Sequence, residues 1–203
     1  MRSRPAVRVA AALAAGGLVL LVACGLVARN GRVGPAERRV FHFVNDLPGW
    51  LEGPLWVFQQ MGNIVVAFAI LVVLALVLRS WRLGVAAAIA VAAKLALERV
   101  VKSVVERRRP GSTVADVVLR GDVSTHGLSF VSGHAGITTA AAMTLTAVLP
   151  GRWRYVPWVV VALNGIGRVY VGAHNPLDIV GGTGLGLIIG APLYAWLASR
   201  EAK

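Results

Sequence analysis

Cysteine and acidic residues are scarce in this chain of 203 residues. Cys24 is the only cysteine, which excludes an internal disulfide and a cysteine-rich metal site. The 9 acidic residues stand against 21 lysines and arginines, giving a formal net charge of +12, and they form no carboxylate cluster suited to a metal ion. The chain also lacks an aromatic-rich basic sheet, a zinc finger and a basic helix. We therefore expect no metal, no cofactor and no nucleic-acid partner.

Apolar residues are abundant instead. They make up 57% of the chain, compared with about 45–50% in a typical soluble domain, and the mean hydropathy is +0.70. The basic residues cluster between the apolar runs, where anionic lipid headgroups or a phosphorylated substrate can balance their charge. The composition predicts a membrane protein, and the lack of internal repeats and low-complexity linkers predicts a single domain over residues 1–203.

Six apolar runs predict an all-α protein with six transmembrane helices. The predicted spans cover roughly residues 9–28, 63–78, 84–102, 135–149, 156–169 and 177–197, and the second could begin near residue 55. Residues 38–44 predict a short amphipathic helix at the membrane interface. Cys24 ends a Leu-Val-Ala-Cys sequence that resembles a lipoprotein processing site, but the apolar run continues past it, which favours an ordinary buried cysteine.

The third run carries charges inside the predicted membrane. Lys94, Glu98 and Lys102 recur every four residues and therefore share one helical face. Such groups are costly in a bilayer unless they are paired or face a water-filled cavity. They form either a self-satisfied ion ladder or a polar stripe that positions Lys102, and we favour the stripe.

The turn between the fifth and sixth runs contains Arg168, His174 and Asp178. Pro176 suits the first turn of a helix, which puts Asp178 one turn inside the sixth helix and His174 just outside it. A carboxylate at this spacing can fix the tautomer of the imidazole and leave its other nitrogen free to attack. Alternatively, the stretch is a tight loop in which Asp178 caps the helix or balances local charge.

Ser132, Gly133 and His134 open the fourth run. Ser132 is a suitable N-cap, Gly133 permits close backbone approach, and the exposed N–H groups of a helix start can bind an anion beside His134. The loop before them holds residues that we expect to be solvated: Asp116, Arg120, Asp122 and His126.

The ends of the predicted spans bring the polar groups together. Counting the spans places these residues at one membrane face: Lys102, Arg109, Ser132, Gly133, His134, Arg168 and His174. Three cations, two histidines and a helix N-terminus at one face describe a phosphate pocket.

Three motifs in this order resemble those of the type 2 phosphatidic acid phosphatase superfamily, which includes bacterial isoprenyl pyrophosphate phosphatases. The first, Lys, six residues, Arg-Pro, corresponds to residues 102–110. The second, Pro-Ser-Gly-His, corresponds to residues 131–134, with Val131 in place of proline. The third, Ser-Arg, five residues, His, three residues, Asp, corresponds to residues 167–178, with Gly167 in place of serine. Val131 should alter loop rigidity, and Gly167 should make oxyanion binding weaker or dependent on a backbone N–H.

The resemblance covers residues 102–178 and implies a metal-independent mechanism. It implies that His174 attacks phosphorus, that Asp178 holds the tautomer of His174, and that His134 protonates the leaving oxygen and then activates water. It also implies that the phosphate is bound by Lys102, Arg109, Arg168 and the backbone of Ser132 and Gly133.

The expected substrate is a membrane lipid with a phosphate monoester or pyrophosphate at headgroup level, of isoprenyl or phosphatidyl type, and we favour an isoprenyl lipid. Two alternatives remain: a lipid phosphotransferase with the same intermediate, and a lipid or anion transporter with Lys94, Glu98 and Arg99 along its path. The cytoplasmic ends of the spans would hold Arg2, Arg4, Arg8, Arg79, Arg82, Arg152, Arg154, Arg200 and Lys203. With the motif cations discounted, the positive-inside rule places the active site at the extracytoplasmic face of the cell membrane.

Overall fold

The computed structural model describes residues 3–121 and 123–199, and their regular secondary structure is helical throughout. The α-helices are α1 (Ser3–Ala28), α2 (Pro35–Asn45), α3 (Glu52–Gln60), α4 (Ile64–Val77), α5 (Trp81–Val105), α6 (Gly133–Val148), α7 (Val156–Tyr170) and α8 (Pro176–Ala198). Short 3-10 helices cover Gly49–Leu51, Pro110–Ser112 and Gly151–Tyr155. The all-α prediction is confirmed. Asp122, together with Arg2, Arg200 and Lys203 of the orientation prediction, lies outside the described residues.

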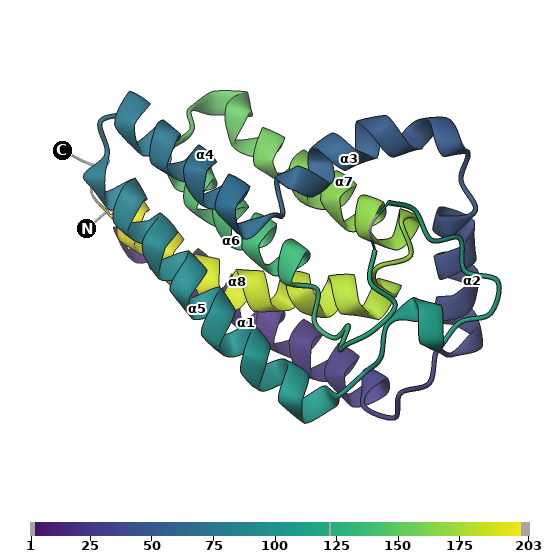
Figure 1. The fold of residues 1–203 in the computed structure, drawn as a ribbon. Coiled ribbons are helices and arrows are strands. Elements are labelled where there is room, and N and C mark those ends of the chain that lie inside the picture. Colours follow the sequence, from purple (N-terminus) through teal and green to yellow (C-terminus); the bar gives the residue numbers. More distant parts are fainter. Residues whose placement is uncertain (1–2, 122, 200–203) are drawn as a thin grey trace.

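The long helices lie side by side and give the molecule two different ends (Figure 1). The start of α1 and the end of α8 lie at one end, whereas α2 and the long loop between α5 and α6 lie at the other. Local capping explains where several helices begin: Asn63 accepts from the N–H of Val65 at 2.9 Å at the start of α4, and Ser80 accepts from the N–H of Leu83 at 3.4 Å at the start of α5.

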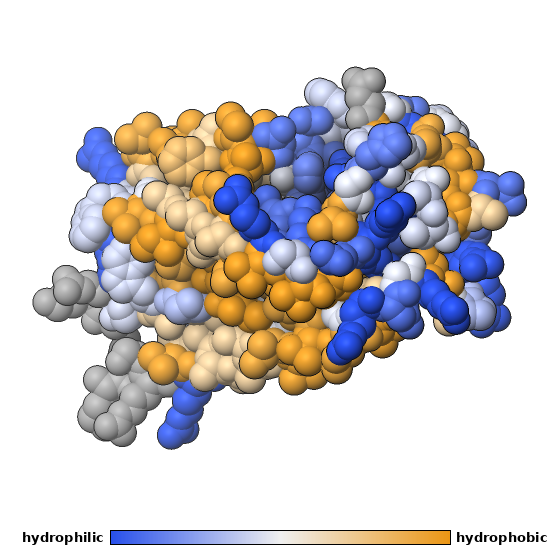
Figure 2. Space-filling view, turned by 60° about the horizontal axis from the view of Figure 1, so that its bottom comes forward, coloured by the Kyte–Doolittle hydropathy of each residue, from blue (hydrophilic) through white to orange (hydrophobic). Residues whose placement is uncertain are grey.

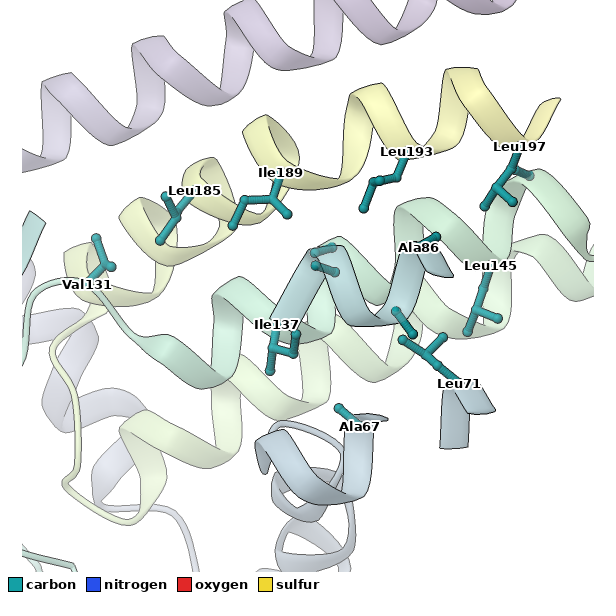
Figure 3. Close-up of a cluster of buried hydrophobic side chains, with 14 of the residues drawn as sticks. Ala67, Leu71, Ala86, Val131, Ile137, Leu145, Leu185, Ile189, Leu193 and Leu197 are labelled. Atoms are coloured by element: carbon teal, nitrogen blue, oxygen red, sulfur yellow. The ribbon is translucent and has the colours of Figure 1, made fainter. Parts of the chain in front are cut away.

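Helix α8 runs through the centre of the bundle. Its core side chains recur every four residues, at Leu185, Ile189, Leu193 and Leu197, and lie beside α6 in Figure 3. On another face its backbone touches α1, because a Cβ on Gly184 would lie only 2.6 Å from the carbonyl oxygen of Gly17. The absence of a side chain at Gly184 therefore permits the close packing of α8 against α1.

Within residues 3–121 and 123–199, two helices are long and apolar enough to cross a membrane, Pro5–Ala28 and Pro176–Ala198. A third crossing is counted if Gly49–Gln60 and Ile64–Val77 form one span, although the chain bends by 61° between them. Residue 55, where the second predicted span could begin, therefore lies in α3 and not in a straight continuation of α4. Helices occur at all six predicted positions, but α6 and α7 have 16 and 15 residues, fewer than the about 20 that an untilted span requires. Six crossings therefore remain a prediction.

The exterior differs between the middle and the ends of the bundle. Large apolar side chains are exposed on the helices, as at Val19 (66%), Leu76 (73%) and Val104 (75%). Figure 2 shows such side chains over the body of the molecule and hydrophilic ones gathered toward one end. A surface of this kind suits contact with lipid, in agreement with the prediction of a membrane protein.

Candidate active site

The turn between α7 and α8 encloses His174. Gly172 has a φ of 76°, a left-handed conformation that favours glycine, and it reverses the chain after α7. The N–H groups of Ala173 and His174 donate to the carbonyl oxygen of Arg168 at 3.0 and 3.3 Å. Pro176 opens α8 as predicted. As a result, His174 is only 3% exposed.

Asp178 lies one turn inside α8 and faces His174. The Nδ1 atom of His174 lies 3.7 Å from Oδ2 of Asp178, slightly longer than a hydrogen bond. The same Oδ2 accepts the N–H of Asn175 at 2.8 Å, so Asp178 also satisfies a donor at the helix start. The helix cap is therefore present, and the same carboxylate lies beside the imidazole, whose Nδ1 has no hydrogen-bond partner within the described residues.

The electrostatic surroundings favour the neutral form of His174. Burial lowers the pKa of His174 to about 4; the charges of Arg168 and Arg109 act in the same direction, and Asp178 opposes them. At neutral pH the ring therefore keeps a lone pair on one nitrogen, which is the form that a nucleophile needs.

The start of α6 lies against the start of α8. Ser132 caps α6 by accepting the N–H of Ala135 at 3.4 Å, and its own N–H donates to the carbonyl oxygen of Asp178 at 2.9 Å. His134 follows and packs at the break between α3 and α4, where a Cβ on Gly62 would lie 2.7 Å from its Cδ2. His134 and His174 are near enough for their charges to interact. The second and third motifs therefore meet, as the sequence predicted.

Two motif arginines have a buried donor without a partner. The buried Nε atoms of Arg109 and Arg168 have no hydrogen-bond partner among residues 3–121 and 123–199. Arg168 is anchored at its other end, because its Nη1 donates to Oε1 of Gln59 at 3.1 Å. Both guanidinium groups act on the charge of His174. Buried donors without partners are costly, and an anion that accepts from both arginines would remove that cost.

Lys94, Glu98 and Lys102 form an ion ladder on α5. The carboxylate of Glu98 lies 2.6 Å from the Nζ of Lys94 and 2.7 Å from the Nζ of Lys102. A Cβ on Gly133 would lie 2.6 Å from this carboxylate, so the close approach at Gly133 is made by α5. The structure shows the internally paired ladder, with Glu98 and Lys94 beside the start of α6, and the positioning of Lys102 stays a prediction.

Sequence patterns do not single out Arg107 and Glu37, which the structure places behind Asp178. Arg107 is fully buried, and its Nη1 donates to Oδ1 of Asp178 at 3.1 Å. Its Nη2 also donates to Oε2 of Glu37 at 2.6 Å. Arg107 is one of three consecutive arginines, and spacing does not distinguish it from the exposed Arg108. The position of Glu37 in the first turn of a mostly basic amphipathic helix is a weak signal.

Gln59 is a third residue that sequence reasoning missed. It is 7% exposed, and its side chain fills the space at Gly167, where a Cβ would lie 2.9 Å from Cγ of Gln59. The motif serine would therefore collide with Gln59. No sequence pattern relates positions so far apart.

One loop prediction is wrong. Arg120 was expected to be solvated, but its Nη1 donates to the carbonyl oxygens of Asn45 and Tyr170 at 2.7 and 2.6 Å. These oxygens belong to the last residues of α2 and α7, which lack partners within their own helices and attract a donor. Asp116 and His126 are exposed, in agreement with the prediction.

Comparison with known proteins gives matches over most of the chain. A sequence profile described as the PAP2 superfamily matches residues 80–202. An undecaprenyl-diphosphatase of Sulfolobus acidocaldarius is 31% identical over 67% of this chain and 66% of its own length. A decaprenylphosphoryl-5-phosphoribose phosphatase of Mycobacterium tuberculosis is 31% identical over 86% of this chain and 85% of its own length.

Solved structures share the fold. A transmembrane PAP2-type phosphatidylglycerolphosphate phosphatase from Bacillus subtilis superposes with a TM-score of 0.73 at 20% identity, over 92% of this chain and 97% of that chain. Aquifex aeolicus LpxE superposes with a TM-score of 0.67 at 23% identity, over 76% of this chain and 92% of that chain.

Proposed function

This chain belongs to the PAP2 superfamily, and we propose that it hydrolyses a phosphate from a membrane lipid through a phosphohistidine formed on His174. Membership confirms the resemblance seen in the three motifs, and the prediction of a lipid phosphatase is confirmed at the level of the family. The proposal depends chiefly on one observation: His174 is buried beside the carboxylate of Asp178, and the charges of Arg109 and Arg168 help to keep its ring neutral.

In the first step, Nε2 of His174 attacks phosphorus. A P–N bond forms while the bond between phosphorus and the leaving oxygen breaks, and that oxygen takes a proton from His134. Asp178 faces Nδ1, so it favours the tautomer that leaves Nε2 free and stabilises the positive charge that develops on the ring. The negative phosphate favours the protonated form of His134.

In the second step, water attacks the phosphohistidine. His134, now neutral, accepts a proton from the water as its oxygen bonds to phosphorus and the P–N bond breaks. Inorganic phosphate leaves, and both histidines return to their starting forms.

Cations and backbone donors stabilise charge on the phosphoryl oxygens. We assign this role to Lys102, Arg109 and Arg168, with the N–H groups of Ser132 and Gly133 at the start of α6. The Ser132 N–H already donates to Asp178, so its contribution requires that bond to be shared or exchanged. Because fixed cations fill the role that a metal ion would have, we expect activity that resists EDTA and is inhibited by vanadate.

The substrate proposal follows from the chemistry and from the relatives. The names of two curated relatives specify isoprenyl carriers, an undecaprenyl diphosphate and a decaprenylphosphoryl sugar phosphate. We therefore propose an isoprenyl phosphate or pyrophosphate as substrate. We further propose one domain over residues 1–203, six membrane crossings and a site at the extracytoplasmic face.

Phosphate release by the purified protein from isoprenyl and glycerolipid phosphates tests the proposal. His174→Ala should abolish release, whereas His126→Ala, which removes an exposed histidine, should leave it unchanged. Phosphate that appears on a second lipid instead of in water would indicate the phosphotransferase. Release that survives His174→Ala would contradict the proposal, and lipid movement without release would indicate the transporter.

A further inference from the structure

A buried chain of three charges lies behind His174. Arg107 lies between two carboxylates, with Nη1 at 3.1 Å from Oδ1 of Asp178 and Nη2 at 2.6 Å from Oε2 of Glu37. The side chains of Arg107 and Asp178 are 0% exposed and that of Glu37 is 7% exposed. Charges so enclosed are little screened by solvent and affect one another strongly.

Glu37 comes from α2, outside all three motifs, and reaches the start of α8. Besides Arg107, its Oε1 accepts the N–H of Leu177 at 3.0 Å. This contact joins the interfacial helix α2 to the helix turn that carries Asp178. Burial opposes the charged form of Arg107, but Glu37 and Asp178 outweigh it and raise the pKa of Arg107 above its ordinary value, so the guanidinium stays charged.

The charge of the chain depends on Glu37. Two carboxylates and one guanidinium leave one net negative charge next to His174, which stabilises the positive charge of a phosphorylated imidazole. Without Glu37, Arg107 would neutralise Asp178 alone and the net charge would be zero. The shortest contact of Arg107 is to Glu37, which draws the guanidinium away from Asp178.

The other charged or titratable groups near His174 are the same with and without Glu37. They are Arg109 after α5, His134 on α6, Arg168 on α7 and, from α1, the thiol of Cys24. Arg109, Arg168 and a protonated His134 are positive and disfavour a second positive charge on His174. The buried negative charge would therefore offset these positive groups when His174 becomes positively charged.

We propose that Glu37 is a positioning residue of the active site, which acts through Arg107 and Asp178 to keep one negative charge behind His174. This inference rests on the proposed function, since it assigns Glu37 to the formation of the phosphohistidine.

Glu37→Gln tests the inference, because glutamine keeps the size of the side chain and an oxygen that can accept from Leu177. We expect kcat to fall roughly tenfold or more, by analogy with the loss of one hydrogen bond to a charged group, with little change in KM. The acid limb of the pH profile should move to lower pH, because His174 becomes harder to protonate. Glu52→Gln, which removes an exposed acid in the first turn of α3, is the matched control and should change neither quantity.

The double variant Glu37→Gln with Arg107→Gln removes one negative and one positive charge and restores the net charge behind His174. It should return the acid limb toward the wild-type position, which a purely structural role does not predict. A folded Glu37→Gln variant with wild-type kcat and acid limb would overturn the inference. A loss of activity that only follows a loss of folded protein would also overturn it. Failure of the wild-type protein to release phosphate would instead refute the proposed function.

Discussion

Arg107 and Arg109 are two residues apart in one basic run, yet the structure gives them opposite surroundings. Both terminal nitrogens of Arg107 are bound to carboxylates, and its side chain is fully buried. A buried Nε without a partner is common to Arg107 and Arg109, but Arg109 forms no ion pair with a carboxylate in the described part of the chain, and its charge lowers the pKa of His174. Arg168, from the other side of the site, resembles Arg109 in this respect.

The difference separates arginines that stabilise the structure of the site from arginines that can bind an anion. A guanidinium between two carboxylates has its charge balanced within the protein. A guanidinium that forms no ion pair with a carboxylate keeps a charge that a bound phosphate can balance. The comparison therefore predicts that substitutions of Arg107 chiefly affect stability and that substitutions of Arg109 or Arg168 chiefly affect catalysis.

The largest effect is expected for Arg107→Met. Removing the guanidinium leaves Glu37 and Asp178 buried without their shared partner, which should lower the free energy of unfolding by about 3–5 kcal/mol. Urea or thermal unfolding in detergent micelles measures this loss. The exposed Arg108 provides the control, since Arg108→Met should unfold like the wild type. Equal stability of the two variants would refute the assignment of Arg107 as the structural arginine.

Arg168→Ala should show the opposite behaviour. We expect kcat/KM to fall on the order of 10²–10³-fold, the usual cost of removing one donor to a developing oxyanion, while the unfolding transition changes little. Phosphate release and thermal unfolding of the same preparation separate the two quantities. Arg154→Ala removes an exposed arginine of the 3-10 helix that precedes α7 and should retain full activity. A variant of Arg168 that unfolds as readily as Arg107→Met would remove the distinction between the two classes.

The sequence predicted the positions of the candidate catalytic groups better than it predicted the residues that support them. His174, Asp178, Ser132 and His134 meet as expected, because their spacing relative to helix starts determines where they lie. Spacing could not identify Glu37, because its contact with Arg107 joins segments separated by 70 residues. Such contacts depend on how helices pack, which periodicity within a single helix does not specify.

In the fold, too, local features could be predicted from the sequence, whereas contacts between helices could not. Helices occur where apolar runs predicted them, and their starts follow local caps such as Asn63 and Ser132. Membrane crossing is harder to derive, because α6 and α7 are short and α5 carries the charges of the ion ladder. The misplaced Arg120 has a related cause, since the carbonyl oxygens that bind it become neighbours only after α2 and α7 have packed.

The arginines at His174 should also shape the pH dependence. Since burial and these charges, opposed by Asp178, hold the pKa of His174 at about 4, the acid limb of kcat/KM that reports protonation of His174 should lie well below neutral pH. Below the pKa, protonation removes the nucleophilic lone pair, and activity should fall about tenfold per pH unit. Rates corrected for the ionisation of the substrate phosphate test this. A fall centred near the ordinary histidine pKa of about 6.5 would contradict the predicted environment.

The smallest effect is expected where this chain departs from its family, at Gly167. Gly167→Ser restores the motif residue, but its Cβ would lie 2.9 Å from Cγ of Gln59, the residue that anchors Arg168. Overpacking of this kind costs about 1–3 kcal/mol, so we expect a several-fold loss of kcat/KM through displacement of Gln59 and Arg168. Adding Gln59→Ala makes room for the serine, and the double variant should be more active than Gly167→Ser alone. Phosphate release by the two single variants and the double variant measures this coupling. Strictly additive effects would show that Gln59 and position 167 act independently, and that glycine at this position does not depend on the side chain that fills its space.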